Sequence, residues 1–141
     1  MQYHVGRAID HVHLKVRDIA ASRGFYDAVF GALGLPPTQG GTDQFHADEL
    51  YVSAAKPPIE PLTSGLHLAF QAADRDAVHR FHAAALAAGG RDNGAPGERS
   101  YHAGYYAAFA LDPDGNNIEA VYHGPIQRSA PSIVIMRVVE K

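Results

Sequence analysis

The 141-residue sequence contains no cysteine. A disulfide framework, a thiolate nucleophile and a cysteine-bound metal are therefore excluded. The sequence also has no strong excess of positive or negative charge. Its 12 basic and 15 acidic residues are spread along the chain and give a net charge of −3. We therefore expect neither nucleic acid nor a membrane surface as a partner. No apolar run approaches the roughly 18 residues of a membrane-spanning helix, and residues 1–7 lack the apolar core of a signal peptide. The sequence thus predicts a cytoplasmic protein.

The chain is comparatively rich in histidine, with nine residues, and has enough apolar side chains for one core. Hydrophobic residues make up 46% of the sequence, which at this length is sufficient for a domain that folds alone. Imidazole and carboxylate groups are therefore the main chemical groups from which a catalytic or metal site could be built.

Two segments share one strand–helix pattern at an offset of 56 residues. Residues 9–16 and 65–72 each alternate between apolar and polar side chains, which predicts two half-buried strands. Each strand is followed by an apolar stripe at helical spacing, which predicts a helix. The offset aligns a strand histidine, a helix-capping aspartate, a helix phenylalanine and a glycine at the helix end, in the pairs His11 and His67, Asp18 and Asp74, Phe25 and Phe81, and Gly34 and Gly90.

Such a repeat indicates two copies of one supersecondary unit that associate about a pseudo-twofold axis. We expect a single domain over residues 1–141, with module 1 at about residues 8–58, module 2 at about residues 64–123 and a tail at residues 124–141. Residues 132–139 of the tail are too apolar for a free end, which predicts an additional strand packed on the body or on a partner subunit.

Shorter signals complete the expected secondary structure. Residues 45–47 and 50–54 favour short strands, and residues 104–111 favour a longer one. Residues 91–102 are rich in glycine and are expected to be irregular. The glycines of residues 91–104 would permit this segment to close over a pocket as a lid, but the sequence leaves open whether it does.

The strongest local signal is the Asp-Pro-Asp-Gly turn at residues 112–115. Its proline presets φ, and its glycine can adopt the left-handed conformation that a short hairpin loop requires. In the strand that follows, Ile118 and Glu119 point to opposite faces. A lone glutamate on a strand is most often solvated. The two histidines at equivalent repeat positions favour a second interpretation.

His11, His67 and Glu119 all fall on the polar faces of strands, and together they form a candidate two-histidine, one-carboxylate metal site. Three protein ligands leave coordination positions open for a substrate. Such a site suits iron(II) first, and then Zn²⁺, Mn²⁺ or Ni²⁺. Other histidines could replace these ligands or orient them, namely His13, His102 and His123.

The combined motifs resemble the vicinal oxygen chelate superfamily, which includes glyoxalase I, extradiol dioxygenases, fosfomycin-resistance thiol transferases and bleomycin-binding proteins. The resemblance covers roughly residues 8–123. It implies an α+β fold of two βαβββ modules that form a cupped mixed sheet, with metal ligands at His11, His67 and Glu119. The segments that carry it are residues 10–14 with Asp18 and Phe25-Tyr26, residues 66–69, and residues 111–119.

The resemblance also implies an activity. The expected protein is a divalent-metal-dependent enzyme in which the metal chelates vicinal oxygens of a small substrate and acts as a Lewis acid. An isomerase or lyase, an extradiol-type dioxygenase and a thiol transferase remain open. Many relatives pair their modules across subunits, so we expect a homodimer. The alternative is a non-catalytic small-molecule binding protein of the bleomycin-resistance type. The residues expected in catalysis are Glu119, His13, His102 and Tyr105.

The chain departs from each branch of the superfamily. Glyoxalase I has a further carboxylate ligand late in its first module, whereas residues 50–55 contain no acid and Glu49 lies at their edge. The potassium-binding Ser-Glu-Gly loop of the fosfomycin enzymes has no counterpart in residues 101–106. Extradiol dioxygenases usually carry two double modules, and this chain has one.

Overall fold

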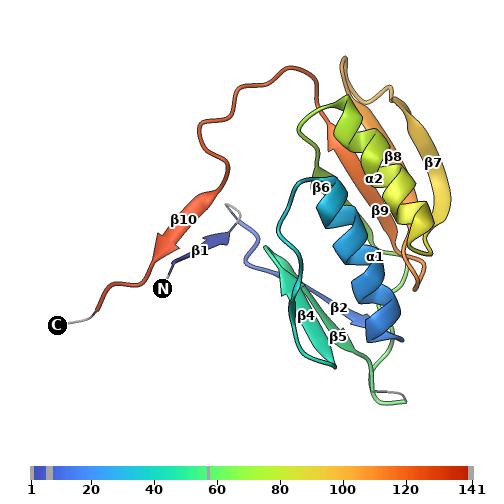
Figure 1. Ribbon diagram of the computed structural model, residues 1–141, viewed down its shortest axis with the longest axis vertical. Helices are drawn as coiled ribbons and strands as arrows, with labels where there is room; N and C mark the ends of the chain where they lie inside the picture. Colours follow the sequence, from blue (N-terminus) through green and yellow to red (C-terminus); the bar gives the residue numbers. More distant parts are fainter. Residues whose placement is uncertain (1, 6–7, 57, 140–141) are drawn as a thin grey trace.

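The computed structural model describes residues 2–5, 8–56 and 58–139. Two modules of the same topology form the body, and the two ends of the chain form a ribbon beside it (Figure 1). The α+β fold of two βαβββ modules is thus confirmed. No helix in the described part of the chain is both long and apolar enough to cross a membrane.

Module 1 is a four-stranded sheet with one helix. Its strand order is β2-β5-β4-β3, with β2 parallel to β5 and the other pairs antiparallel. The elements of this module are β2 (Val12–Val16), α1 (Ile19–Ala32), β3 (Gln39–Gly40), β4 (Gln44–Ala47) and β5 (Leu50–Ala54).

Module 2 repeats this arrangement. Its strand order is β6-β9-β8-β7, again with the first strand parallel to the last. The elements of this module are β6 (His67–Gln71), α2 (Arg75–Ala87), β7 (Arg91–Glu98), β8 (Tyr106–Leu111) and β9 (Asn117–Tyr122).

The helix ends follow the predicted signals, with one difference. Asp18 and Asp74 are the N-caps, and each accepts a hydrogen bond from the backbone N–H three residues later, at 3.0 and 2.7 Å. After α1, Gly34 has a φ of 75°, but after α2 the left-handed residue is Gly89, with a φ of 94°. The predicted glycines at both helix ends are thus present, although the structural counterpart of Gly34 is Gly89 and the 56-residue offset aligns it with Gly90.

The expected irregular segment at residues 91–102 is also corrected, because residues 91–98 form β7. The register of β7 with β8 shifts between Asp92 and Gly94 and again between Gly94 and Gly97. Such irregularities break the alternation of side chains that marks a strand in a sequence. Most of the segment is thus fixed in a sheet, and it is not a free lid.

The core lies between the helices and the apolar faces of the two sheets. In Figure 1 the two helices lie next to each other on one side of the body. Large buried side chains from both modules form one continuous cluster, which includes Leu14, Phe25, Phe30, Phe45, Val52, Val78, Phe81 and Ile118. The opposite face of each sheet is left for polar residues, which include the predicted site.

A buried polar contact joins α1 of module 1 to the hairpin turn of module 2. The Tyr26 hydroxyl donates to Oδ2 of Asp112 at 2.7 Å. Oδ1 of the same carboxylate accepts hydrogen bonds from the backbone N–H groups of Asp114 and Asn116, both at 2.9 Å. Burial, followed by the charge of Asp112, raises the pKa of Tyr26 well above its ordinary value, so the phenol remains a neutral donor.

The Tyr26→Phe variant is expected to lower the free energy of unfolding by about 1.5–3 kcal/mol, because a hydrogen bond to a buried charged group is lost. Urea denaturation measures this as a lower midpoint at an unchanged slope. Tyr101→Phe is the matched control, since the Tyr101 side chain is exposed, and its midpoint should stay near that of the wild type. Equal midpoints for the two variants would show that the contact does not stabilise the fold.

Candidate metal centre

Strands β6 and β9 bring His67 and Glu119 together on the open face of module 2. The two strands are parallel, and His67 lies opposite Asn117. Glu119 lies two residues after Asn117 on β9, so its side chain points to the same face as that of His67. Nε2 of His67 lies 2.7 Å from Oε2 of Glu119. The His67 side chain is 54% exposed, whereas Glu119 is 1% exposed. Of the two potential metal ligands, His67 therefore faces solvent, and Glu119 is enclosed by protein.

The buried carboxylate of Glu119 is held by two side chains. The Tyr105 hydroxyl donates to Oε1, and Oε2 faces His67. Among the described residues, no lysine or arginine forms an ion pair with Glu119. A buried carboxylate is costly unless it is paired with positive charge or fully hydrogen-bonded. The environment of Glu119 therefore suits a bound cation.

The two donor atoms also suit a metal by their chemistry and spacing. Imidazole nitrogen and carboxylate oxygen bind zinc at about 2.0–2.2 Å, so two such ligands lie about 2.8–3.1 Å apart at right angles and about 3.3–3.6 Å apart at the tetrahedral angle that zinc prefers. The observed separation of 2.7 Å between Nε2 and Oε2 is a hydrogen-bonding distance, so the two atoms would move slightly apart around a metal ion. His67 and Glu119 thus fit two neighbouring positions around one metal ion.

Tyr105 determines how Glu119 is presented. Burial, followed by the hydrogen bond to Glu119, raises the pKa of Tyr105 to about 12. Tyr105 therefore stays protonated at neutral pH and can only donate to the carboxylate. Because it occupies Oε1, it leaves Oε2 directed at His67. We expect Tyr105 to fix the orientation of a ligand.

His102 and His123 form an imidazole pair against the ring of Tyr105. Nδ1 of His102 lies 2.9 Å from the carbonyl oxygen of Ala103, and its Nε2 lies 2.8 Å from Nδ1 of His123. A carbonyl can only accept, so His102 donates from Nδ1, and its neutral Nε2 accepts from Nδ1–H of His123. When both rings are neutral, this arrangement leaves Nε2 of His123 without a proton. Both rings contact Tyr105 edge-on, with centroids at 5.3 and 5.2 Å.

The histidines of module 1 have other partners. Nδ1 of His11 lies 2.6 Å from Asp10, and Nε2 of His13 lies 2.7 Å from the Ser53 hydroxyl. Burial, followed by the charge of Lys15, lowers the pKa of His13, which favours its neutral form. In the described part of the chain, no three histidine, cysteine, aspartate or glutamate side chains are grouped closely enough to hold a metal. The single chain thus brings together His67 and Glu119, without His11.

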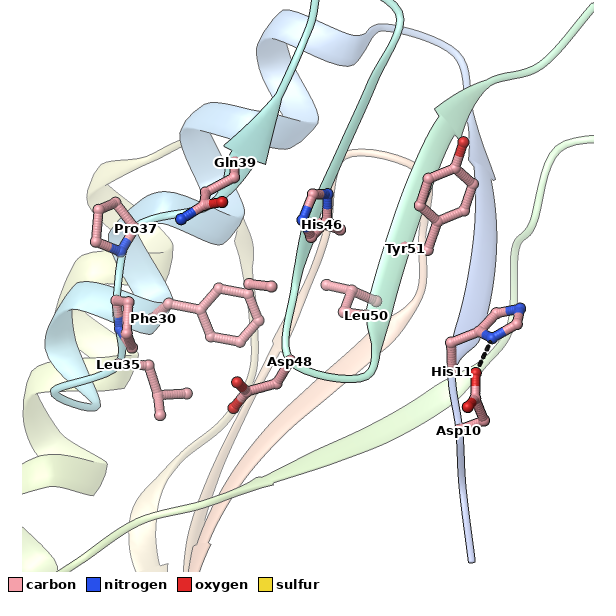
Figure 2. A pocket seen from close by; sticks show the side chains of 12 residues that line it. Asp10, His11, Phe30, Leu35, Pro37, Gln39, His46, Asp48, Leu50 and Tyr51 are labelled. Atoms are coloured by element: carbon pink, nitrogen blue, oxygen red, sulfur yellow. Dashed lines mark hydrogen bonds and ion pairs between the residues drawn. The ribbon is translucent and has the colours of Figure 1, made fainter. Parts of the chain in front are cut away.

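His11 instead borders a pocket of about 630 Å³ at one end of module 1. His46 of β4 and Tyr51 of β5 are opposite each other in the sheet, and Figure 2 shows both side chains in this pocket, with Asp48 at the turn between the strands. Phe30 from α1 forms part of the apolar wall. The pocket is therefore a mixed imidazole, phenol and apolar surface beside a predicted metal ligand.

The repeat places a phenol where module 2 has its glutamate. Glu119 lies opposite the residue two positions after His67, and the residue two positions after His11 is His13, which lies opposite Tyr51. Tyr51 is therefore the counterpart of Glu119 in module 1. A second carboxylate of the kind found in glyoxalase I is replaced by a tyrosine at this position.

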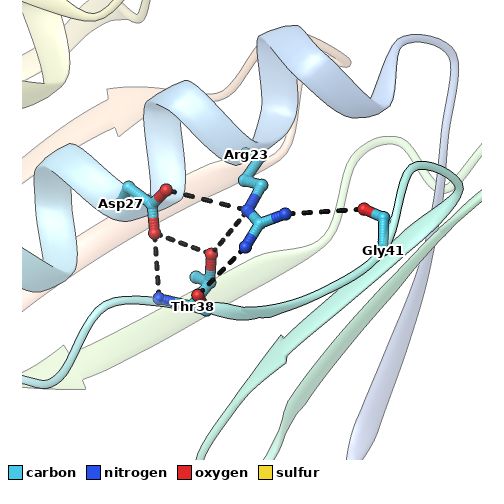
Figure 3. Close-up of polar contacts among 4 residues, drawn as sticks. All are labelled: Arg23, Asp27, Thr38 and Gly41. Atoms are coloured by element: carbon cyan, nitrogen blue, oxygen red, sulfur yellow. Dashed lines mark hydrogen bonds and ion pairs between the residues drawn. The ribbon is translucent and has the colours of Figure 1, made fainter.

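One wall of the pocket is fastened by contacts that no sequence motif revealed. The backbone N–H and hydroxyl of Thr38 donate to Oδ1 of Asp27 at 2.9 and 2.6 Å. Arg23 in turn donates to the carbonyl oxygens of Thr38 and Gly41 at 3.2 and 3.4 Å (Figure 3). These bonds hold the segment after α1, which includes Gln39 of the pocket, against the helix. They connect polar side chains of α1 to the segment that contains β3, and the apolar stripe that predicts the helix does not predict such polar contacts.

The fold and the paired imidazole and carboxylate define a two-module βαβββ protein with a candidate metal site. Residues 8–120 match the family model of the Glyoxalase/Bleomycin resistance protein/Dioxygenase superfamily. The chain belongs to this superfamily.

Solved structures agree with this assignment. A glyoxalase/bleomycin resistance protein from Albidiferax ferrireducens is 34% identical over 79% of this chain and 95% of its own, with a TM-score of 0.67. A glyoxalase-related enzyme from Fulvimarina pelagi is 17% identical over 94% of this chain and 99% of its own, with a TM-score of 0.68. A lactoylglutathione lyase from Agrobacterium tumefaciens is 22% identical over 82% and 92%, with a TM-score of 0.57. Among curated proteins, none matches this chain.

Proposed function

We propose that this protein is a divalent-metal-dependent enzyme that acts on a small substrate through two vicinal oxygens. The observation that carries the proposal is the pair of His67 and Glu119, whose donor atoms lie 2.7 Å apart on the open face of a sheet. The burial of Glu119, which has no lysine or arginine partner in the described part of the chain, supports a bound metal. Membership in a superfamily that includes glyoxalases and dioxygenases supports an enzymatic role.

The third ligand in this proposal is His11 of a second copy of the chain. His11 is the repeat counterpart of His67, its side chain is 62% exposed, and within one chain it does not join the pair. A homodimer in which module 1 of one copy faces module 2 of the other supplies the missing imidazole. Each dimer then contains two equivalent sites, as twofold symmetry requires.

The metal that such a site would hold is iron(II), zinc, manganese or nickel, and it would polarise the substrate oxygens as a Lewis acid. Three protein ligands leave room for two substrate oxygens. Because Tyr51 replaces a second carboxylate, the phenol can donate a hydrogen bond to the substrate without adding negative charge. The site therefore favours an anionic or easily ionised oxygen pair.

The imidazole pair supplies an acid–base group to this proposal. Nε2 of His123 is free to accept a proton from the substrate, and the hydrogen bond to Nε2 of His102 then stabilises the resulting charge. His102 thus acts through His123. Proton transfer of this kind serves an isomerase, a lyase or an extradiol-type dioxygenase, and assays with loaded protein must distinguish them.

The test of the proposed function is metal titration of protein purified without an affinity-tag metal. We expect about one equivalent of a divalent transition metal per chain, with chelator-treated protein as the control. Absence of uptake for all four candidate metals would contradict the proposal. The remaining function would then be metal-independent binding of a small molecule, as in the bleomycin-resistance branch.

Tyr105→Phe is expected to weaken metal affinity by about 10–100-fold, the usual effect of removing a group that orients a ligand. Glu119 remains in place, but its Oε1 loses the Tyr105 donor. Competition against a chromophoric chelator measures the change. Tyr101→Phe is the control, because that ring packs on Tyr105 at 5.0 Å without contacting the carboxylate through its hydroxyl. Equal affinities in both variants would exclude the orienting role.

A further inference from the structure

The two ends of the chain form a ribbon beside the two modules. Strands β1 (Gln2–Val5) and β10 (Ile133–Met136) pair antiparallel, with Tyr3 opposite Ile135. In the described part of the chain they form a sheet of their own, and neither joins the four-stranded sheets. Figure 1 shows this terminal ribbon displaced from the helices, at the end of a long connection from β9. An isolated two-stranded ribbon is at best marginally stable in water.

Strand β10 exposes apolar side chains on both of its faces. Ile133 and Val134 point to opposite faces and are 45% and 46% exposed, and Met136 is 69% exposed. Val138 and Val139, just beyond the strand, are 87% and 93% exposed. A contiguous exposed apolar strand of this kind marks an interaction surface.

The solvent-accessible surface of the chain indicates how large a contact with a second molecule it could make. The chain exposes 8834 Å². A compact monomer of 15.1 kDa exposes about 7,100 Å². The excess of roughly 1,700 Å² is about twice the 800 Å² that each partner contributes to a standard interface. The projecting ribbon and the open sheet faces thus leave enough surface for a stable dimer.

We propose that the terminal ribbon is a dimerisation arm that packs on a second copy of this chain. The inference rests on the proposed function, in which a second copy must supply His11 to the pair of His67 and Glu119. The arm provides a contact outside the metal site that holds the two copies in register. Metal binding then depends on ribbon residues that lie outside the metal site and contact none of the metal-coordinating side chains.

A second copy fits the arm better than an unrelated partner. Residues 132–136 carry no charge, so they offer no complementarity to a charged partner. An isologous contact needs only that the same apolar patch meets itself across a twofold axis. The match to the Fulvimarina pelagi structure extends over 94% of the chain, a share that residues 8–123 are too few to provide, so part of the terminal segments has a counterpart in that structure.

The test uses the full chain with the double substitution Val134→Asp and Met136→Asp, two residues on the same face of β10. Sedimentation velocity and metal titration are measured on each protein, and circular dichroism checks the fold. We expect a dimeric, metal-binding wild type and a folded, monomeric double variant that has lost stoichiometric metal. Ile59→Asp is the matched control, because Ile59 is 87% exposed and lies outside the ribbon, and it should remain a metal-binding dimer.

The outcomes separate this inference from the proposed function. A monomeric wild type, or a double variant that stays dimeric, would contradict the proposal that the terminal ribbon is a dimerisation arm. A monomeric double variant that keeps stoichiometric metal would overturn the dependence of metal binding on the arm. A dimeric wild type that takes up no metal would overturn the proposed function instead, and with it the functional part of this inference.

A spin label tests the arm without a disruptive substitution. Because the chain has no cysteine, Met136→Cys provides one attachment site. We expect an immobilised label in the dimer that becomes mobile on dilution to monomer. A label that is equally mobile at all protein concentrations would overturn the contact even if the charged variant failed to fold.

Discussion

Glu119→Gln is expected to lose metal, with an affinity that falls by more than the roughly 100-fold seen when an orienting group is removed. The amide has the same size as the carboxylate, so the buried position next to Tyr105 is still filled. It lacks the negative charge, and its neutral oxygen is a poor ligand compared with a carboxylate. The fold should persist, because removing a buried charge does not create a cavity.

Elemental analysis and metal titration measure this result on protein whose circular dichroism matches the wild type. Glu98→Gln is the control, because Glu98 is an exposed carboxylate of the same module that pairs with Arg75 at 2.8 Å. It should keep about one equivalent of metal. Stoichiometric metal in Glu119→Gln would remove Glu119 from the ligand set. His67→Ala should behave like Glu119→Gln.

His11→Ala is expected to lose stoichiometric metal as well, although His11 contacts neither His67 nor Glu119 within one chain. Its side chain is 62% exposed and, among the described residues, hydrogen-bonds to the neighbouring Asp10, so its removal should leave stability nearly unchanged. A large loss of metal binding together with a small change in the free energy of unfolding is the result expected if His11 coordinates the metal of another copy of the chain.

His46→Ala is the matched control for His11→Ala. His46 lies in the same pocket of module 1 and is also exposed, but it belongs to no predicted ligand set. We expect it to bind metal as the wild type does, in the same titration. If His11→Ala also titrates as the wild type, His11 is not a ligand, and the site must be completed by another residue.

Most of the fold could be predicted because its signals are local. Side-chain alternation marked β2 and β6, aspartates marked the starts of both helices, and the Asp-Pro-Asp-Gly turn marked the hairpin. β7 was missed because its irregular pairing with β8 shifts the register, so its side chains do not alternate. The strand in the tail was expected from its apolar composition. Its pairing with residues 2–5 was not, because no local pattern links the two ends of a chain.

The site could be predicted only as a set of residues. The polar faces were readable from alternation, but the 2.7 Å contact between His67 and Glu119 depends on the register of β6 against β9. The hydrogen bond from Tyr105 depends on the loop between β7 and β8. The source of the third ligand cannot be read from a repeat, since the two modules can face each other within one chain or between two.

The central claim is that each metal site takes His11 from one copy and His67 with Glu119 from the other. Mixing His11→Ala with Glu119→Gln and allowing subunit exchange tests it most directly. A mixed dimer has one intact site, so we expect two proteins that bind no metal alone to bind about 0.25 equivalents per chain after random exchange. A mixture that still binds no metal, although the wild type is loaded, would contradict the shared site.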